Sequence, residues 1–443
     1  MIIYYSIVTI LGLGIALLPW RIGLLGRILG MMTASMAWLY ASALGAGRPP
    51  TGIGALGLFV RLDPSPATVE GVTIAMSLLV AGVGAFSSHR LVRAHRFAKL
   101  QVRLPKLFTY SVLFVALASS IYLALALGVD SLFSYSGYGS IKAWQDIFVD
   151  DAVGRLIAVA FRPLAILVIV LAVANANNGD KGYLTLALPV VALALALGLS
   201  EASRIVAVYT ATAAICLLLV GRRVLAMIAL LAAFFSVAYA LEARTQHELG
   251  LNYVTQYLSD ALANEDLVAE VLTNVSSGLF VTSAAANVAN EDGYSDSYKL
   301  LSFLPTVDAI DGFQAAKAQS EQRILSYLPF NAFAEAALFG PAYWVVFWGV
   351  LIASALAVNS SLRFGTIPFL ALLCLFCLGW VFASQYPVRN SLRYFYILLV
   401  LRAMLPTVYR WIRHRRERQD SQIVLARTNA GSPTSVSIGA SNR

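Results

Sequence analysis

The chain has 443 residues, of which 59% are hydrophobic and 12% are charged, and its formal net charge is +9. Soluble domains carry roughly 25% charged residues, so the composition excludes a soluble enzyme and, over most of the length, intrinsic disorder. Basic loops that orient a membrane protein account for the positive charge, and we therefore expect no binding to nucleic acid. The three cysteines lie in apolar runs, where we expect packing and no metal or redox chemistry. The sequence thus predicts an all-α polytopic membrane protein.

Eleven apolar runs are long enough to cross a hydrocarbon layer of about 30 Å as helices. They cover residues 2–18, 28–45, 70–88, 107–128, 154–174, 183–199, 205–220, 224–241, 338–358, 364–384 and 394–409. The first run begins Met-Ile-Ile-Tyr-Tyr and lacks both a basic flank and a small-residue cleavage site. We therefore interpret it as a retained span and not as a signal peptide.

Basic residues in the connections predict the orientation of these helices. The segments 89–96 and 410–418 are strongly basic, and such segments stay on the cytoplasmic side next to anionic lipid. The N-terminus is then outside and the C-terminus inside. The predicted organisation is helices 1–8 in residues 1–241, a large outer loop in 242–337, helices 9–11 in 338–409 and a basic, disordered cytoplasmic tail in 410–443. Within the loop, helical stretches are expected at 252–275 and 314–325.

Two arginines are predicted to lie inside the fifth helix. Arg155 and Arg162 are seven residues apart, which returns them to one helical face, and Arg162 would lie roughly 10 Å below the outer surface. An arginine in the membrane costs at least about 2.5 kcal/mol on insertion scales, so a functional role is the first hypothesis. The alternative is that Arg155 extends to the interface while Arg162 forms a structural ion pair.

Two further groups of charged residues are predicted at the outer ends of helices. Glu201 and Arg204 are spaced i, i+3 between the sixth and seventh helices, and Arg389 and Arg393 are spaced i, i+4 at the start of the last helix. Interfacial anchoring is the alternative for each group. Guanidinium groups bind phosphate oxygens in a bidentate manner, so arginines from several helices predict a site for a diphosphate.

Four side chains on the outer side could act as a general base. In order of preference they are Glu335, Asp308, Asp311 and His247. The other three histidines are assigned to cytoplasmic segments, so the sequence predicts neither a metal site nor a cofactor. The alternative for each carboxylate is a solvated loop residue.

Two short motifs and the general plan resemble a bacterial family. Ser200-Glu-Ala-Ser-Arg204 resembles the Ser-Arg start of a helix in the Wzy-type polymerases of O-antigen and exopolysaccharide repeat units. Asn331-Ala-Phe-Ala-Glu335, followed by Gly340, is similar to their Asn-x-x-x-Glu-x-x-x-x-Gly stretch. Eleven helices with one large outer loop also match their plan. One departure is that Glu201-Ala202 replaces the Gly that often precedes Ser-Arg.

The resemblance implies a GT-C-like, metal-independent glycosyltransferase in the bacterial inner membrane, with the N-terminus and the large loop in the periplasm. Its substrate would be undecaprenyl-diphosphate-linked oligosaccharide, and a polysaccharide chain-length regulator would be a partner beside membrane lipid. Arg204 and Glu335 match the motif positions, whereas Arg155, Arg162, Arg389 and Arg393 come from the charge argument. A direct displacement would invert the anomeric centre, either with a base or without one, since diphosphate is a good leaving group.

Three other functions remain open. An O-antigen ligase shares the plan and differs in its acceptor. A transporter or flippase of lipid-linked oligosaccharide would also need a cationic cavity, but its charges should line both halves of the membrane and its helices should form matching repeats. A structural or sensory membrane subunit would use the large loop as a partner-binding surface.

Overall fold

Long apolar helices dominate the fold. The computed structural model describes residues 1–17, 23–48, 61–63, 65–87, 106–128, 130–133, 135–136, 152–243, 248–265, 267–268, 271, 278–289, 293–304, 322–325 and 328–430. Within these ranges, nine helices are long and apolar enough to cross a membrane, so the chain is an all-α polytopic membrane protein. They correspond to nine of the eleven predicted spans. The other two, 2–18 and 205–220, are apolar helices of 16 and 15 residues.

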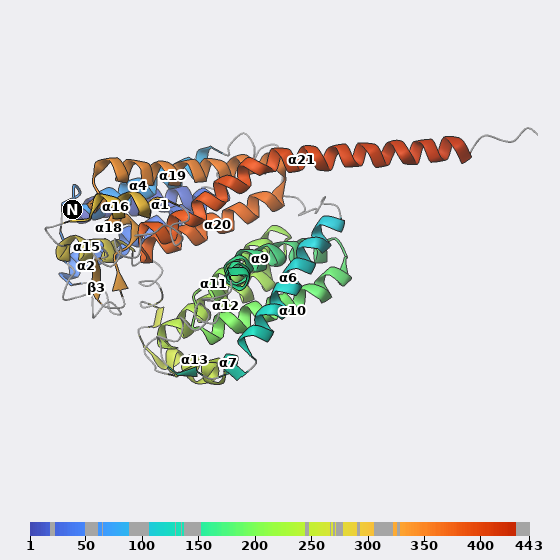
Figure 1. Ribbon diagram of the computed structural model, residues 1–443. Helices are drawn as coiled ribbons and strands as arrows, with labels where there is room; N and C mark the ends of the chain where they lie inside the picture. The colour runs from blue at the N-terminus through green and yellow to red at the C-terminus, as the bar shows by residue number, and fades with distance from the viewer. Residues whose placement is uncertain are drawn as a thin grey trace, which may run out of the picture.

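The helices form two groups, which Figure 1 shows from the side. The first, which we call the terminal group, combines helices from both ends of the chain. It contains α1 (Ile2–Leu17), α2 (Leu24–Ala46), α4 (Val69–Phe86), α15 (Gly278–Val288), α16 (Asp296–Ser302), α18 (Ala332–Leu338), α19 (Pro341–Ser361), η3 (Leu362–Phe364), α20 (Thr366–Gln385) and α21 (Val388–Ala430). Two short strands, β3 (Arg323–Leu325) and β4 (Leu328–Pro329), form an antiparallel pair beside α15.

The second group, which we call the central group, comes from the middle of the chain. It contains α6 (Lys106–Leu127), α7 (Asp130–Phe133), α9 (Ala152–Asn177), α10 (Lys181–Ser200), α11 (Ile205–Leu219), α12 (Arg223–Ala243), η2 (Leu251–Tyr253) and α13 (Val254–Ala263). The strands β1 (Tyr135–Ser136) and β2 (Glu248–Leu249) pair antiparallel and join its connections. The two groups meet where α20 packs against α9 and α11, a contact that we call the seam.

A sharp turn at Tyr386 and Pro387 joins α20 to α21. Tyr386 is extended, with φ −132° and ψ 158°, and Pro387 follows it. The residue before a proline is disfavoured in the α conformation, so α20 ends at Gln385 and α21 starts afresh at Val388. The two helices then pack against each other along the bundle. This turn places the first turn of α21, with Arg389 and Arg393, next to the seam.

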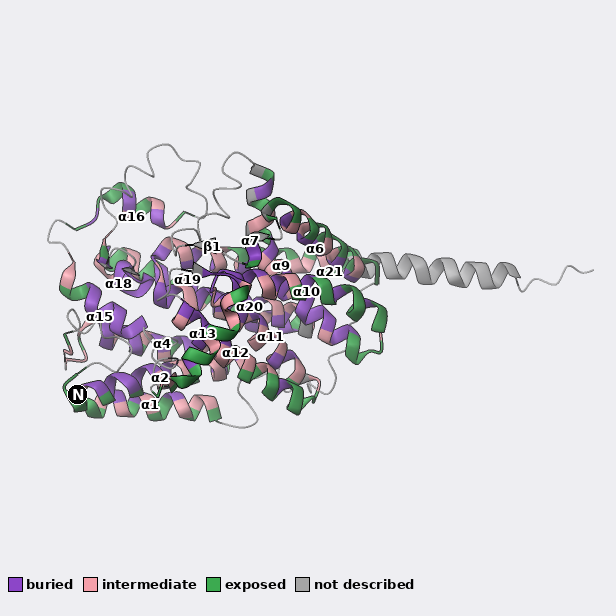
Figure 2. Ribbon diagram, turned by 90° about the horizontal axis from the view of Figure 1, so that it is seen from below, coloured by how far each residue is buried: buried purple, intermediate pink, exposed green. Residues whose placement is uncertain are grey.

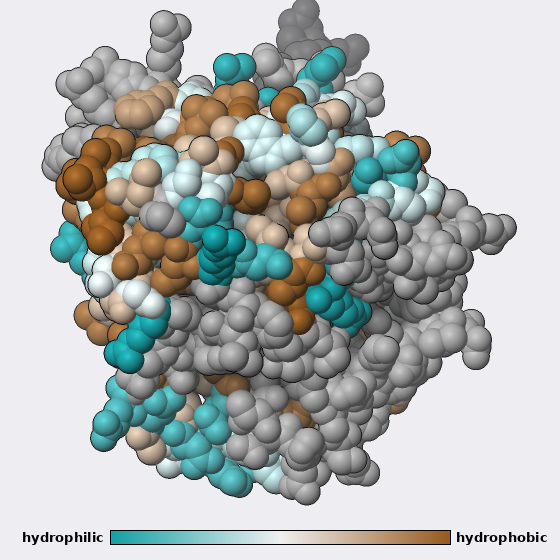
Figure 3. Space-filling model, turned by 90° about the vertical axis from the view of Figure 1, so that its left-hand side faces the viewer, coloured by the Kyte–Doolittle hydropathy of each residue, from teal (hydrophilic) through white to brown (hydrophobic). Residues whose placement is uncertain are grey.

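Part of the predicted outer loop lies in the protein core. α15 has 11 residues and packs against α2, α4, α18 and α20, and its residues 278–285 are buried (Figure 2). An apolar helix of this length is too short to span a membrane but can be buried within a bundle. At the end of the molecule that holds α15, α16 and the N-terminus, hydrophilic side chains lie among hydrophobic ones (Figure 3). The stretch Gly278–Val288 within the segment 242–337 therefore belongs to the helix bundle.

Two expectations for local structure require correction. The tail 410–443 is expected to be disordered, but α21 continues as a helix through Ala430. Adding residues to an existing helix avoids the cost of nucleation, and Gln, Leu, Ala and Arg in this segment are good helix formers. The predicted helix over 314–325 is wrong at its end, where β3 occupies Arg323–Leu325. Residues 314–321 and 431–443 lie outside the described ranges.

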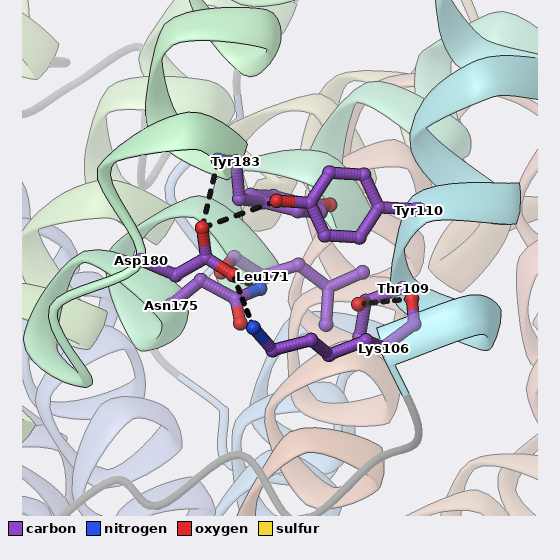
Figure 4. Close-up of polar contacts among 7 residues, drawn as sticks. All are labelled: Lys106, Thr109, Tyr110, Leu171, Asn175, Asp180 and Tyr183. Carbon is purple, nitrogen blue, oxygen red and sulfur yellow. Dashed lines mark hydrogen bonds and ion pairs between the residues drawn. The ribbon is translucent and has the colours of Figure 1, made fainter.

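A polar cluster joins α6 to the start of α10, at the end of the central group opposite the turn between α10 and α11 (Figure 4). Asp180 caps α10 by accepting from the Tyr183 backbone N–H at 3.1 Å, and the same oxygen accepts from the Tyr110 hydroxyl at 3.1 Å. The Lys106 ammonium lies 3.9 Å from the other oxygen. The Tyr183 N–H, with help from Tyr110 and Lys106, holds the pKa of Asp180 below its usual value.

We expect Asp180→Ala to destabilise the protein in a pH-dependent way. Because the pKa of Asp180 is lower in the folded state, its carboxylate stabilises the fold above the unfolded-state pKa of about 4, and this stabilisation is lost as the pH falls through the folded-state pKa. The thermal midpoint of the purified variant should lie below that of wild type at pH 7, with the gap closing on acidification. Asp180→Asn keeps the cap and should give an intermediate midpoint. An equal gap at pH 7 and pH 3 would contradict this role.

Candidate functional site

An ion pair joins the third turn of α9 to the turn between α10 and α11. The Arg162 Nη2 donates to Glu201 Oε2 at 3.0 Å. The Glu201 side chain is 5% exposed, whereas that of Arg162 keeps 40% exposure. Burial raises the pKa of Glu201, and the positive charge of Arg162 opposes that shift. The sequence suggested Arg204 as the local partner of Glu201, but the carboxylate reaches across to α9 instead.

This ion pair is closely packed within the central group. The cavity beside it has a volume of only about 10 Å³ and lies between α9, α10 and α11, with Tyr209 among its lining residues. A space of that size holds about one water molecule. Within the described residues, the ion pair therefore faces a tight niche and not a wide pocket. Any substrate would approach it from the side on which Arg162 is exposed.

The start of α21 brings a second arginine to the same region. Tyr394 and Tyr386 lie near Arg162, and Tyr394 also lies near Arg393. Arg393 is half-buried and donates to Asn390 Oδ1 at 2.7 Å. Arginines from the central and terminal groups are thus near the same tyrosine across the seam. That these arginines bind a diphosphate together stays a prediction of the charge pattern.

The other arginines predicted to bind a diphosphate lie at the starts of three helices. Arg204 is half-buried at the N-cap of α11, and Arg389 is half-buried in the first turn of α21. The backbone of Arg155 belongs to the first turns of α9, but its side chain lies outside the described part of the chain. Three candidate bases, Asp308, Asp311 and His247, also lie outside the described ranges, and their roles stay predictions.

The turn between α10 and α11 contains a strained residue. Ala202 has φ 49°, which makes it the one non-glycine residue with positive φ among those described. A left-handed backbone costs an alanine roughly 1 kcal/mol relative to glycine. This is the place where the resembling family often has Gly before Ser-Arg. Glu201 and Arg204 therefore flank a backbone held in an unfavourable conformation, a feature that occurs preferentially at functional sites.

Glu335, the first candidate base, lies in a buried network at the start of α21. Its Oε1 accepts from the Tyr298 hydroxyl at 3.0 Å, and its Oε2 accepts from the Val388 backbone N–H at 2.6 Å. The residue is 2% exposed. Both carboxylate oxygens thus already accept from protein donors, which favours a structural role over proton transfer.

Asn331 anchors the short helix that carries Glu335. Its Oδ1 caps α18 by accepting from the Ala334 N–H at 2.9 Å, and its Nδ2 donates to the Gly278 carbonyl at 2.6 Å and the Ser384 carbonyl at 3.3 Å. These bonds connect α18 with α15 and α20. The Asn and Glu of the sequence motif therefore anchor the same short helix through two separate sets of buried hydrogen bonds.

Sequence reasoning missed the tyrosines around Arg162. Tyr209, Tyr386 and Tyr394 come from α11, the α20–α21 turn and α21. A tyrosine within an apolar run is typical of an interfacial position, so the sequence held no signal for their shared location. Within the described ranges, no three His, Cys, Asp or Glu side chains gather closely enough to hold a metal ion.

Comparison with known proteins returns no match for this chain: no family model, no curated protein and no solved structure is significantly similar to it.

Proposed function

We propose that the protein is a membrane glycosyltransferase that polymerises undecaprenyl-diphosphate-linked oligosaccharide repeat units at the periplasmic face of the bacterial inner membrane. One arrangement carries the proposal: Arg162 of α9, held by Glu201 at 3.0 Å with 40% of its side chain exposed, and Arg393 of α21 come from different helix groups and lie near Tyr394 at the seam. The Ser-Arg and Asn-x-x-x-Glu motifs of the resembling family lie in or beside this region, at Arg204 and Glu335.

The chemistry needs positive charge that is in place before the reaction. Breaking the bond between an anomeric carbon and a diphosphate leaves negative charge on the leaving group, and arginines held in position stabilise that charge more in the transition state than in the ground state. Glu201 serves this purpose by fixing one side of Arg162, whose exposed side stays available to the substrate. Direct attack by a sugar hydroxyl of the incoming repeat unit would invert the anomeric centre.

The attacking hydroxyl of the acceptor sugar could be activated by a general base. This base would take the proton from the hydroxyl. Because the contacts of Glu335 favour a structural role, the remaining candidates are Asp308, Asp311 and His247. A reaction without a base is the alternative, because a diphosphate leaves readily. The GT-C-like fold, the periplasmic side and the chain-length regulator as a partner belong to this same proposal.

Substitution of Arg393 tests the proposal directly. Purified protein in nanodiscs would receive an undecaprenyl-diphosphate-linked repeat unit, and the products would be separated by length. We expect Arg393→Ala to lower the rate of chain growth about 100-fold, the usual effect of removing one donor to a developing anion. Arg410→Ala is the matched control, because Arg410 lies near the other end of the membrane-spanning part of α21 and is exposed.

Two results would contradict the proposal. Wild-type protein that forms no polymer from any lipid-linked repeat unit would rule out the polymerase, and equal rates for the Arg393 and Arg410 variants would remove the proposed role of the seam. Transfer of the glycan to a different lipid acceptor, without chain growth, would identify a ligase.

A further inference from the structure

One carboxylate connects three helices at the start of α21. Glu335 belongs to α18, accepts from the hydroxyl of Tyr298 on α16 at 3.0 Å, and accepts from the backbone N–H of Val388 at 2.6 Å. Val388 is the first residue of α21. Glu335 therefore caps a helix that begins 53 residues later in the chain.

This position is one where a negative charge is needed. The first N–H groups of a helix have no partners within it, and its N-terminus carries a partial positive charge. Arg389 and Arg393 add two full positive charges within the first two turns of α21. An ionised carboxylate bonded to the first N–H offsets this accumulation, and charge-assisted bonds are stronger than neutral ones.

The carboxylate is itself held firmly. Asn331 caps α18 one turn earlier and donates to carbonyls of α15 and α20. Tyr298 stacks on Tyr294 at a ring distance of 5.6 Å, and both rings pack against Phe339, which directly follows α18. Movement of Glu335 would disturb all of these contacts, so the position of Val388 relative to α18 is fixed.

We infer that Glu335 is a positioning residue which fixes the first turn of α21 and thereby sets Arg389 and Arg393 for the diphosphate of the substrate. This inference rests on the proposed function for the identity of the ligand. It replaces the general-base role that the sequence suggested, because both oxygens accept hydrogen bonds from protein donors and the residue is 2% exposed. Such a residue acts on the substrate through the arginines and does not touch the attacking hydroxyl.

Glu335→Gln separates the two roles. The amide oxygen still accepts from the Val388 N–H, while the negative charge is lost. For a positioning residue, we expect kcat to fall about tenfold, because the displaced arginines stabilise the leaving diphosphate less in the transition state, while the acidic limb of the pH profile stays unaltered. For a general base, kcat should fall about 100-fold or more and the acidic limb of the pH profile should disappear. The second result would overturn the inference.

A structural measurement keeps this test independent of polymerase activity. Hydrogen exchange of the amides at 388–393 should speed up at least about fivefold in Glu335→Gln, because the start of α21 opens more often. Tyr298→Phe should cause a smaller change in the same direction. Glu70→Gln is the control: it removes a carboxylate that is 3% exposed in the first turn of α4, and it should leave exchange at 388–393 unchanged.

The outcomes distinguish the two proposals. If wild type has no transferase activity but exchange at 388–393 responds to Glu335→Gln alone, the proposed function fails while the capping of α21 stands. If polymer is made and the exchange rates of the Glu335 and Glu70 variants agree, the positioning role fails while the function stands.

Discussion

Replacing Arg162 with alanine is expected to abolish the formation of long polysaccharide and also to destabilise the protein. The substitution leaves Glu201 as a buried charge without its 3.0 Å partner, and breaking a fully buried pair costs about 3–5 kcal/mol. Arg162 keeps 40% of its side-chain exposure, so solvent screening reduces the expected cost to about 2 kcal/mol. The free energy of unfolding in mild detergent would measure this loss.

The destabilisation should depend on pH in a defined direction. Burial raises the pKa of Glu201, and the charge of Arg162 opposes this rise. In the variant that opposing charge is gone, so the pKa of Glu201 rises further. A carboxyl group whose pKa is raised by folding carries no penalty below its unfolded-state pKa and a growing penalty as the pH rises above it. The Arg162→Ala variant should therefore approach wild-type stability at about pH 4 and depart from it towards pH 7.

A double variant separates stability from catalysis. Arg162→Ala with Glu201→Gln removes the uncompensated charge, so it should recover most of the lost stability. It should still make no long polymer, because the positive charge for the diphosphate is missing. Wild-type polymer length in this double variant would contradict a role for Arg162 in the reaction. Loss of stability equal to that of the single variant would show that packing, and not charge, causes the effect.

Asn331→Ala should have the largest effect on stability outside the seam. The side chain is fully buried, caps α18, and donates to two carbonyl groups in α15 and α20. An unsatisfied buried polar group costs about 1–3 kcal/mol, and a lost N-cap costs about 1 kcal/mol more. We expect a total loss of about 2–4 kcal/mol in the free energy of unfolding, the sum of these two costs.

The same substitution at an exposed site provides the control. Asn252 lies exposed in η2, and Asn252→Ala should change the free energy of unfolding by less than about 0.5 kcal/mol. Chemical denaturation monitored by tryptophan fluorescence is suitable, because Trp348 and Trp380 lie in the aromatic cluster around Phe333 of α18. Similar losses for both variants would mean that Asn331 does not hold α15, α18 and α20 together.

The long helices could be predicted from the sequence because each contains an apolar run near membrane length. α15 could not, because its 11 residues fall below that length and stand within a polar segment. The continuation of α21 through Ala430 was also missed, because composition alone takes no account of the helix that precedes the tail. The length of the apolar run therefore determines which of these helices can be predicted from the sequence.

The site residues show a similar division. Arg162 was recognisable because charge in an apolar run is costly, and Arg393 was recognisable because it is spaced i, i+4 from Arg389 at the start of the last helix. Their partners were not, since Glu201 lies 39 residues from Arg162 and only packing of α9 against α10 brings the two together. The strain at Ala202, with φ 49°, was not predicted: the sequence showed only that Glu201-Ala202 departs from the Gly that often precedes Ser-Arg in the family it resembles. The role of Glu335 needed the fold, because its acceptor bond to Val388 joins segments that are 53 residues apart.

The burial of α15 has a consequence for engineering this protein. A surface loop can be replaced without disturbing the core, whereas α15 packs against α2, α4, α18 and α20 inside the bundle. Phe280, which is fully buried, packs against Tyr40 of α2 at a ring distance of 5.4 Å, so excising α15 would leave a hole lined by aromatic rings. Chimeras that swap substrate specificity should therefore retain residues 278–288 from the recipient.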